Sequence, residues 1–451
     1  MGVFVSTPMN QTAYIVTDFG FGDSGKGGTV DFLTATNPNA TVIRHNGGAQ
    51  AGHNIITGEG KHHTFSQWGC GTFRGCRTFL SRFMGIHPMA MLKEGEILTY
   101  KGVGDPFSLL DISRGALILT PIHQIMNRTR EMARGENRHG TCGLGYGEAV
   151  SMSYSHPDAT IRVEDLYRPE DLLRKLRRQK EIAEVFASEM ALGVRFDPED
   201  YILRLQDFTR RINAVDEETY LKALMASGNP IVCEGAQGVL LDKWHGFHPH
   251  TTWSDTTHAN ALTLLREVGF SGRVHRIGCL RTYLTRHGEG PFPSQASLRN
   301  PELHNSPAGW QGQFRQGHFD PYLARYALEA CGGVDSISLS HLDRIQKEWT
   351  YVEDYGPDFT GLTVRPTPAD DTLYRDDLLP ILQTVRPVFK TMRTTGEFLN
   401  PYNVVDKVSE LLEGDTLPPV GLAHFGPRST DKINLGIPVY YNNIQRRKET
   451  A

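Results

Sequence analysis

Apolar and polar positions follow each other along the chain in blocks that predict the strands and helices of an α/β protein. Short apolar runs at residues 13–18 (AYIVTD) and 41–45 (TVIRH) each lead into a glycine-rich stretch, and similar runs, PIVC and VGLAHF, come later in the chain. The longest amphipathic segment, residues 169–192, predicts a helix whose apolar stripe carries Leu172, Leu173, Leu176, Ile182, Val185, Phe186 and Met190. Apolar run, glycine-rich turn and helix-compatible segment, in that order, favour an α/β fold.

Composition narrows the class of protein. The 451 residues are 39% hydrophobic, and Lys+Arg 47 against Asp+Glu 51 leave a net charge of −4, which argues against a nucleic-acid binder or a polybasic membrane binder. The sequence shows neither a membrane-spanning run nor a signal peptide, and its six scattered cysteines match no zinc or redox motif. We therefore expect a globular cytoplasmic protein, and since no linker or repeat marks a boundary, a single large domain.

Residues 19–28 (FGFGDSGKGG) carry the densest chemistry. Gly20, Gly25 and Lys26 match the phosphate-loop pattern as far as its lysine, in which backbone N–H groups and a helix N-terminus surround phosphate oxygens. The alternative is an ordinary glycine-rich turn between a strand and a helix. The usual Ser or Thr that ligates magnesium is replaced by Gly27, so another group must hold the metal. Asp23 is the candidate, because a carboxylate among phosphate-facing amides is costly unless it binds a cation or handles a proton.

A second glycine-rich turn, in VIRHNGGAQAGHN at residues 42–54, carries His53. A lone histidine is more often a satisfied loop or core side chain than a ligand-binding group. Here Gly47, Gly48 and Gly52 allow a close approach of the backbone to a ligand, so both interpretations of His53 stay open on spacing alone.

Six ordered motifs resemble the adenylosuccinate synthetase family. They are GDSGKGGTVDFL, RHNGGAQAGHN, HGTCGLGYGEA, CEGAQGVLLDKWHG, RTYLTRHGEGPFP and SHLDR. The resemblance implies an α/β fold with a mostly parallel central sheet over residues 13–435, flanked by an extension at 1–12 and a tail at 436–451. It also implies a homodimer that uses GTP and one Mg²⁺ per subunit, with neither nucleic acid nor membrane as a partner.

The resemblance further implies a reaction in which L-aspartate is joined to the 6-position of IMP. In that family the residue matching Asp23 removes the N1 proton and helps bind magnesium, the 6-oxygen attacks the γ-phosphoryl group, and the residue matching His53 stabilises the leaving diphosphate. The amino group of aspartate then displaces the 6-phosphoryl group to give adenylosuccinate. Lys26 and Gln237 complete the expected catalytic set.

The expected binding residues fall into four groups by resemblance. The triphosphate group is Gly22, Ser24, Gly25, Lys26, Gly27, Gly52, His53, Asn54, Arg315, His341, Asp343, Gly426 and Pro427. The purine monophosphate group is Asp23, Gln50, Thr141, Cys142, Gln237, Thr252 and Gln313. The amine donor is expected at Gln311, Gln313 and Arg315, and the metal at Asp23 and Gly52.

Several departures from the family pattern lie on the substrate side. Family members usually have glutamate where Ser24 stands and asparagine where Gln50 stands, and the neutral Gln311 and Gln313 replace cationic residues of the loop that closes on aspartate. These changes leave open a specialised paralogue that acts on another 6-oxopurine nucleotide, such as dGMP, or on another amine, with GTP or ATP. Retention of Asp23 favours the IMP branch. A non-catalytic nucleotide-binding regulator is the alternative from another class.

Two other features have ordinary interpretations. His245, His248 and His250 look like a metal cluster, but a closed zinc site needs four ligands and no cysteine is near in sequence. The family resembled has histidine at the first of these positions and aromatic residues at the other two, so the resemblance implies that they pack in the substrate pocket. Cys142 is interpreted as a substitute for threonine rather than as a reactive thiol.

Overall fold

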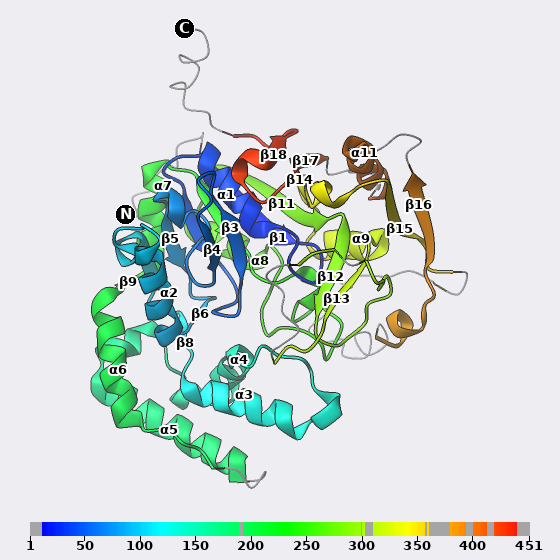
Figure 1. Cartoon of the computed structure of the whole chain (residues 1–451). Coiled ribbons are helices and arrows are strands. Elements are labelled where there is room, and N and C mark those ends of the chain that lie inside the picture. The colour runs from blue at the N-terminus through cyan, green and yellow to red at the C-terminus, as the bar shows by residue number, and fades with distance from the viewer. Residues whose placement is uncertain are drawn as a thin grey trace.

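The computed structural model describes residues 11–188, 193–298, 300–302, 310–356, 359, 379–393, 400–412 and 419–439. Within these residues a ten-stranded sheet runs through the molecule in the order β18-β17-β14-β11-β1-β10-β2-β5-β7-β9 (Figure 1). Its strands are β1 Thr12–Asp18, β2 Thr41–Arg44, β5 Arg77–Leu80, β7 Leu110–Ser113, β9 Asn213–Val215, β10 Ile231–Glu234, β11 Arg273–Arg281, β14 Ser336–Ser340, β17 Val420–His424 and β18 Lys432–Asn434.

Every neighbouring pair in this sheet is parallel except β17 and β18. The strand β1 lies in the interior, with β10 on one side and β11 on the other, and the strand order runs outward in both directions from it. In open parallel sheets, ligands bind beyond the carboxyl ends of the strands where the order reverses. A binding site is therefore expected at the carboxyl ends of the central strands, which are β1, β10, β2, β11, β14 and β17.

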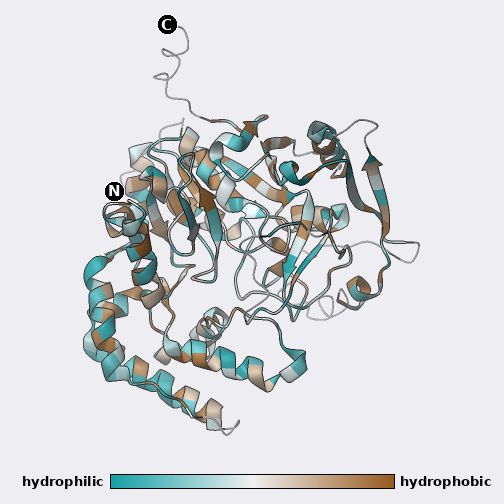
Figure 2. Ribbon diagram, viewed as in Figure 1, coloured by the Kyte–Doolittle hydropathy of each residue, from teal (hydrophilic) through white to brown (hydrophobic). Residues whose placement is uncertain are grey.

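Apolar side chains of β1 alternate between two cores. Ala13 and Ile15 pack with α7 and α8 on one face, and Tyr14 and Val16 pack with α1 on the other. Hydrophobic residues concentrate on the central strands in Figure 2. The helices next to the sheet are α1 Lys26–Thr36, α2 Pro88–Tyr100, α7 Glu217–Ser227, α8 Ala259–Glu267, α9 Pro321–Ala330 and α11 Pro401–Leu411.

A helical arm extends from one side of the sheet (Figure 1). It consists of α3 Pro121–Ala133, α4 Tyr146–Ser155, α5 Pro169–Ser188 and α6 Pro198–Arg211. The predicted helix at 169–192 is present as α5, and Met190 lies outside the described residues. Its buried stripe differs in one respect from the prediction: Val185 is 65% exposed, because the stripe continues through Ala183 and Ala187 instead.

Small two-stranded sheets complete the fold. They are β3 His53–Ile56 with β4 His62–Phe65, β6 Gly85–Ile86 with β8 Leu117–Ile118, β12 Tyr283–His287 with β13 Phe314–His318, and β15 Glu348–Asp354 with β16 Val388–Arg393. Of the expected tail, Ile437 is buried in the core and Pro438 accepts a hydrogen bond from Tyr14, while residues 440–451 lie outside the described part. The α/β fold with a mostly parallel central sheet confirms the prediction from sequence. None of the helices in the described part of the chain is long and apolar enough to cross a bilayer.

Candidate active site

A cavity of about 1300 Å³ opens at the carboxyl ends of the central strands. Of the residues predicted from sequence, those that line it are Gly22, Asp23, Gly25, Lys26, Gly27, Gln50, Gly52, His53, Asn54, Thr141, Cys142, Gln237, Thr252, Gln311, His341, Asp343, Gly426 and Pro427. They come from segments scattered over four hundred positions of the chain, and the parallel sheet brings them to one edge. Ser24, Gln313 and Arg315 are not part of its lining.

The phosphate-loop segment between β1 and α1 is organised by Asp18, the last residue of β1. The Asp18 carboxylate accepts hydrogen bonds from the backbone N–H of Gly20 at 2.8 Å and of Ser24 at 2.9 Å, from the Ser24 hydroxyl at 2.8 Å, and from Lys26 Nζ at 2.7 Å. The Ser24 side chain is therefore turned into the protein instead of toward the cavity. Lys26 is 3% exposed, and its ion pair holds the ammonium at the start of α1.

Asp23 occupies the loop in the left-handed conformation, with φ 60°, and its side chain is 35% exposed in the cavity. Nε2 of His287 lies 3.3 Å from its Oδ2, and Arg281 donates to its backbone carbonyl at 3.2 Å. Burial works to raise the pKa of Asp23, but the hydrogen bond to His287 and the charges of His287, Lys26 and Arg281 outweigh it and lower the pKa below its usual value. Asp23 is thus a carboxylate at neutral pH, able to accept a proton or ligate a cation.

His53 is held by a buried glutamate at the end of β10. Nδ1 of His53 lies 2.5 Å from Oε1 of Glu234, and the same oxygen accepts from the Cys70 thiol at 3.0 Å. The other carboxylate oxygen, Oε2, accepts from the backbone N–H of Cys70 at 2.9 Å. Burial lowers the pKa of His53, although Glu234 opposes the shift. The contact places the proton on Nδ1 and fixes the ring, which leaves Nε2 of this cavity-lining side chain for a ligand.

The expected monophosphate end of the cavity is braced from α3. Glu131 accepts from the backbone N–H groups of Gly140 at 3.0 Å and Thr141 at 3.2 Å, and the Thr141 hydroxyl pairs with Asn127. Burial raises the pKa of the Cys142 thiol, so it stays protonated, in line with a threonine substitute. The turn at 140–142 is therefore held in place by protein contacts before any ligand arrives.

Two other lining residues of the expected monophosphate group are in contact: Thr252 donates to the side-chain oxygen of Gln237 at 3.4 Å. Gln237 follows β10 with φ 58°, and this conformation turns the chain next to the phosphate loop. Gly238, directly after it, has no room for a side chain: a Cβ there would meet the carbonyl oxygen of Gly20 at 2.1 Å. The turn at Gln237 and Gly238 therefore packs directly against the phosphate-loop segment.

The expected base end of the triphosphate site lies beyond β14. His341 adopts φ 64°, and its Nδ1 lies 2.8 Å from the hydroxyl of Ser340. Burial holds the pKa of His341 well below its ordinary value, so the ring is neutral. Asp343, two residues further into the turn, pairs with Arg344 at 3.2 Å and keeps 32% of its side chain exposed. A carboxylate at this position can accept two N–H donors from a base edge.

The expected amine-donor residues are divided. Gln311 lines the cavity, whereas the Arg315 guanidinium donates to the carbonyl groups of Gly288 at 2.6 Å and Gly290 at 3.1 Å. Residues 303–309 of this loop lie outside the described part of the chain. Trp310 packs against Arg128, with 5.4 Å from the guanidinium carbon to the ring centre.

Oxygen ligands for magnesium are present in the cavity. The Asp23 carboxylate and the backbone at Gly52 both line it, and oxygen donors are what Mg²⁺ prefers, together with substrate phosphates and water. Among the described residues, the one cluster with ligand spacing is His53, Cys70 and Glu234, but the 2.5 Å contact between its imidazole and carboxylate is a direct hydrogen bond and leaves no place for an ion. Of the three histidines predicted to pack in the pocket, His248 and His250 line the cavity, whereas His245 is not part of its lining. The ring of His248 meets the carbonyl group of Lys243 at 3.0 Å.

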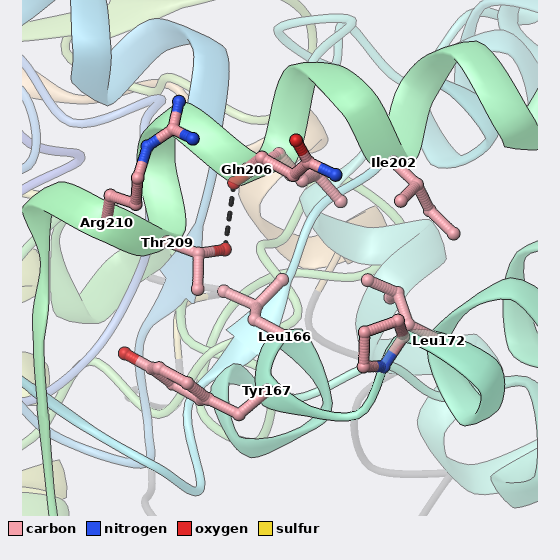
Figure 3. Close-up of a pocket in the computed structure, with 9 residues that line it drawn as sticks. Leu166, Tyr167, Leu172, Ile202, Gln206, Thr209 and Arg210 are labelled. Carbon is pink, nitrogen blue, oxygen red and sulfur yellow. Dashed lines mark hydrogen bonds between the residues drawn. The ribbon is translucent and has the colours of Figure 1, made fainter.

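A second, smaller cavity of about 380 Å³ lies between α5 and α6 (Figure 3). Its lining is Leu166, Tyr167, Pro169, Leu172, Ile202, Leu205, Gln206, Thr209 and Arg210. The Thr209 hydroxyl is already bonded to the carbonyl group of Leu205, as the dashed line shows. This lining includes neither a carboxylate nor a histidine, so the chemistry of the described residues is concentrated in the large cavity.

The chain is similar to known proteins along most of its length. Residues 15–368 match the family model described as adenylosuccinate synthetase. A protein of Chlorobium limicola named adenylosuccinate synthetase is 31% identical over 394 residues, covering 85% of this chain and 86% of its own, and one of Chlorobium chlorochromatii is 33% identical over 341 residues, covering 73% and 76%.

Two solved structures share the fold. Fully ligated adenylosuccinate synthetase from Plasmodium falciparum superposes with a TM-score of 0.78 at 21% identity, covering 93% of this chain and 99% of its own. The succinoaminodeoxyadenylate synthetase of cyanophage S-2L, bound to dGMP and dATP as an energy donor, gives a TM-score of 0.57 at 17% identity, covering 94% and 95%.

Proposed function

Because this chain belongs to the adenylosuccinate synthetase family, and is accordingly a carbon–nitrogen ligase of purine biosynthesis, we propose that it joins L-aspartate to the 6-position of IMP at the expense of GTP. The products are adenylosuccinate, GDP and phosphate. The observation that carries the proposal is the Asp23 carboxylate, ionised, in a glycine-rich loop and in the same cavity as Lys26 and His53. We propose that the protein works as a cytoplasmic homodimer.

Asp23 serves as the base in this proposal. Its lowered pKa keeps it ionised, and its exposed carboxylate can take the proton from N1 of the purine, which makes the 6-oxygen a better nucleophile. His287, against Oδ2, restrains the carboxylate in one orientation. Gln237, at the neighbouring turn, orients the purine through its side-chain amide in this proposal, and its contact with Thr252 supports that role.

Lys26 and His53 stabilise the charge that develops during phosphoryl transfer. Lys26 stands at the N-terminus of α1, where the helix also favours anions. An approaching phosphate adds to the charge of Glu234 in favouring the protonated His53 ring, which can then donate from Nε2. Magnesium, held at Asp23 and Gly52, would supply further charge neutralisation at the phosphate oxygens.

A direct test uses purified protein with magnesium, GTP or ATP, and each of IMP, dIMP, GMP and dGMP, with and without aspartate. Phosphate release and product mass are followed. The proposal predicts a product heavier than IMP by the aspartate adduct, formed with GTP. No turnover with any combination, together with a thermal shift on adding nucleotide, would instead establish a nucleotide-binding regulator.

The second candidate is a specialised paralogue with another amine donor or another 6-oxopurine. The observation that favours it is the loop at 310–315, where Gln311 presents a neutral amide to the cavity and Arg315 is engaged by carbonyl groups. Two carboxylates of aspartate are best held by cationic donors. Phosphate release with IMP, but an adduct only with amines other than aspartate, would identify this paralogue.

A further inference from the structure

Lys432 joins the expected base site to the rest of the triphosphate site. It is the first residue of β18, it stands opposite His424 in the ladder, and it is 8% exposed. Its Nζ donates to the carbonyl oxygens of Arg428 at 2.6 Å and Pro427 at 3.3 Å. These carbonyls belong to the turn at residues 425–431, here named the base-side turn. It includes Gly426 and Pro427, which match the C-terminal loop that contacts the guanine in the family, so the expected base contacts lie in this turn.

The other side of Lys432 faces the helix of the phosphate loop. A Cβ built on Gly28 would lie 3.2 Å from Cε of Lys432 and 3.5 Å from its Nζ. Gly28 is in the first turn of α1, two residues after Lys26. Lys432 therefore fills the space between the base-side turn and the start of α1, and it also lines the large cavity.

A second contact joins the same two segments. Arg74 donates from Nε to Oδ1 of Asp31, a buried residue of α1, at 2.8 Å, and from Nη2 to the hydroxyl of Ser429 in the base-side turn, also at 2.8 Å. The other carboxylate oxygen, Oδ2 of Asp31, is buried without a hydrogen-bond partner in the described residues, and the charge of Lys432 acts on this carboxylate. Attraction between Asp31 and the two cations holds the turn against α1.

A third connection runs through hydroxyl groups beneath the cavity. Nε2 of His424 lies 2.8 Å from the Ser338 hydroxyl, which lies 2.8 Å from the Thr29 hydroxyl. Thr29 in turn donates to the carbonyl group of Gly25, in the phosphate loop, at 3.1 Å. The β17–β18 hairpin is thus connected to the phosphate-loop helix along three separate paths.

We propose that Lys432 is a positioning residue that sets the base-side turn at a fixed distance from the phosphate loop, so that the two ends of a nucleoside triphosphate meet one rigid site. The inference rests on the proposed triphosphate site. The ammonium group of Lys432 already donates to two carbonyl oxygens of the base-side turn. Lys432 therefore acts on the turn rather than on the phosphates. A preorganised turn avoids the ordering cost that a loose one adds to binding.

The test compares ligands with and without a base. Binding of GTP, ATP and inorganic tripolyphosphate, each with magnesium, is measured by calorimetry for wild type and Lys432→Met. The inference predicts that the preferred nucleotide binds about tenfold more weakly to the variant, while tripolyphosphate affinity changes less than about twofold, since the base contributes only to the first. In turnover, KM for the nucleotide rises and kcat at saturation stays within about twofold.

Lys390→Met is the matched control, because Lys390 is an exposed β16 residue paired with Glu353 and should leave all values unchanged. Ser429→Ala removes one bond to the base-side turn with little risk to folding, and should weaken nucleotide binding in the same selective way but less. Equal weakening of tripolyphosphate and nucleotide would overturn the inference in favour of direct phosphate contact. Unchanged nucleotide affinity in both variants would overturn it outright. A wild-type protein that binds neither ligand would refute the proposed triphosphate site itself, and the inference with it.

Discussion

Replacing Glu234 by Gln tests whether the buried carboxylate holds the site together. Glu234 is fully buried at the end of β10 and accepts from Nδ1 of His53 and from both the backbone and the thiol of Cys70, with Arg44 3.9 Å away. Glutamine has the same shape but a single acceptor oxygen. Its NH₂ group would have to face one of these donors, so one buried donor loses its partner.

The size of the stability loss expected for Glu234→Gln follows from the pKa of Glu234. Burial alone would raise the pKa of Glu234, but Arg44, His53 and the Cys70 N–H lower it from 4.5 to about 2. That difference corresponds to about 3 kcal/mol of stability at neutral pH. Breaking a buried ion pair by removing one partner costs about 3–5 kcal/mol, so the two lines of reasoning agree. We therefore expect Glu234→Gln to lower the free energy of unfolding by about 3 kcal/mol at pH 7.

Urea unfolding at several pH values measures the loss of unfolding free energy in Glu234→Gln and tests whether it comes from the charge of Glu234. Because the folded-state pKa lies below the ordinary 4.5, the stabilisation is fully present above pH 4.5 and is lost as pH falls toward 2. The gap between wild type and variant should therefore shrink by about 1.4 kcal/mol for each pH unit below 4.5. Glu348→Gln, at an exposed pair with Arg393, serves as the control and should show neither effect. A variant as stable as wild type, or a gap that does not change with pH, would refute the assignment of Glu234 as a charged partner of His53.

Three further changes give separate outcomes. Asp23→Asn should lower kcat by about 10²- to 10⁴-fold with nucleotide binding partly kept, measured by phosphate release and calorimetry, and a near-normal rate would exclude its role as base. Gly238→Ala should abolish nucleotide binding, since its Cβ would meet the carbonyl of Gly20, whereas Gly104→Ala, with open space around it, should be neutral in the same thermal-shift assay. Burial lowers the pKa of Lys432 from 10.5 to about 8, so the stability of wild type relative to Lys432→Met should rise as pH increases from 8 to 10.5; a constant difference in urea midpoints would contradict this.

The sequence predicted the strand and the helix on either side of the first glycine-rich segment because the pattern that defines them is local. A phosphate loop needs a strand, a turn and a helix within about thirty residues, and the spacing of Gly20, Gly25 and Lys26 shows all three. The long-range partners escaped prediction for the opposite reason. Asp18 and Glu234 are separated by more than two hundred positions, and parallel pairing of β1 with β10 brings them to the same edge. The sequence did contain a hint for both residues, because Asp18 and Glu234 are each an acidic residue at the end of an otherwise mostly apolar run.

The contacts of His287 and Glu131 were harder to predict from the sequence. His287 lies in a motif known from the resemblance, but its contact with Asp23 depends on the β12–β13 hairpin, which spacing along the chain does not reveal. Glu131 sits on α3 among charged residues that resemble an ordinary solvated face, yet it is fully buried against the turn at 140–142. Burial of single polar side chains on amphipathic helices is set by tertiary packing, so periodicity alone could not separate Glu131 from its neighbours.

The two ends of the cavity differ in how far they are organised without ligands. At the expected phosphate end, Asp18, Glu234 and the close approach of Gly238 to Gly20 fix the loop backbone and the side chains of Lys26 and His53, for which we propose catalytic roles. At the expected amine-donor end, the Arg315 guanidinium is already hydrogen-bonded to carbonyl groups, and Gln311 presents only a neutral amide to the cavity. Phosphoryl transfer depends mainly on preorganised charge, whereas capture of a dicarboxylate depends on cations that meet it. The identity of the amine is therefore the property in which this chain has most room to differ from its relatives, and the comparison of aspartate with other amines is the most informative part of the turnover experiment.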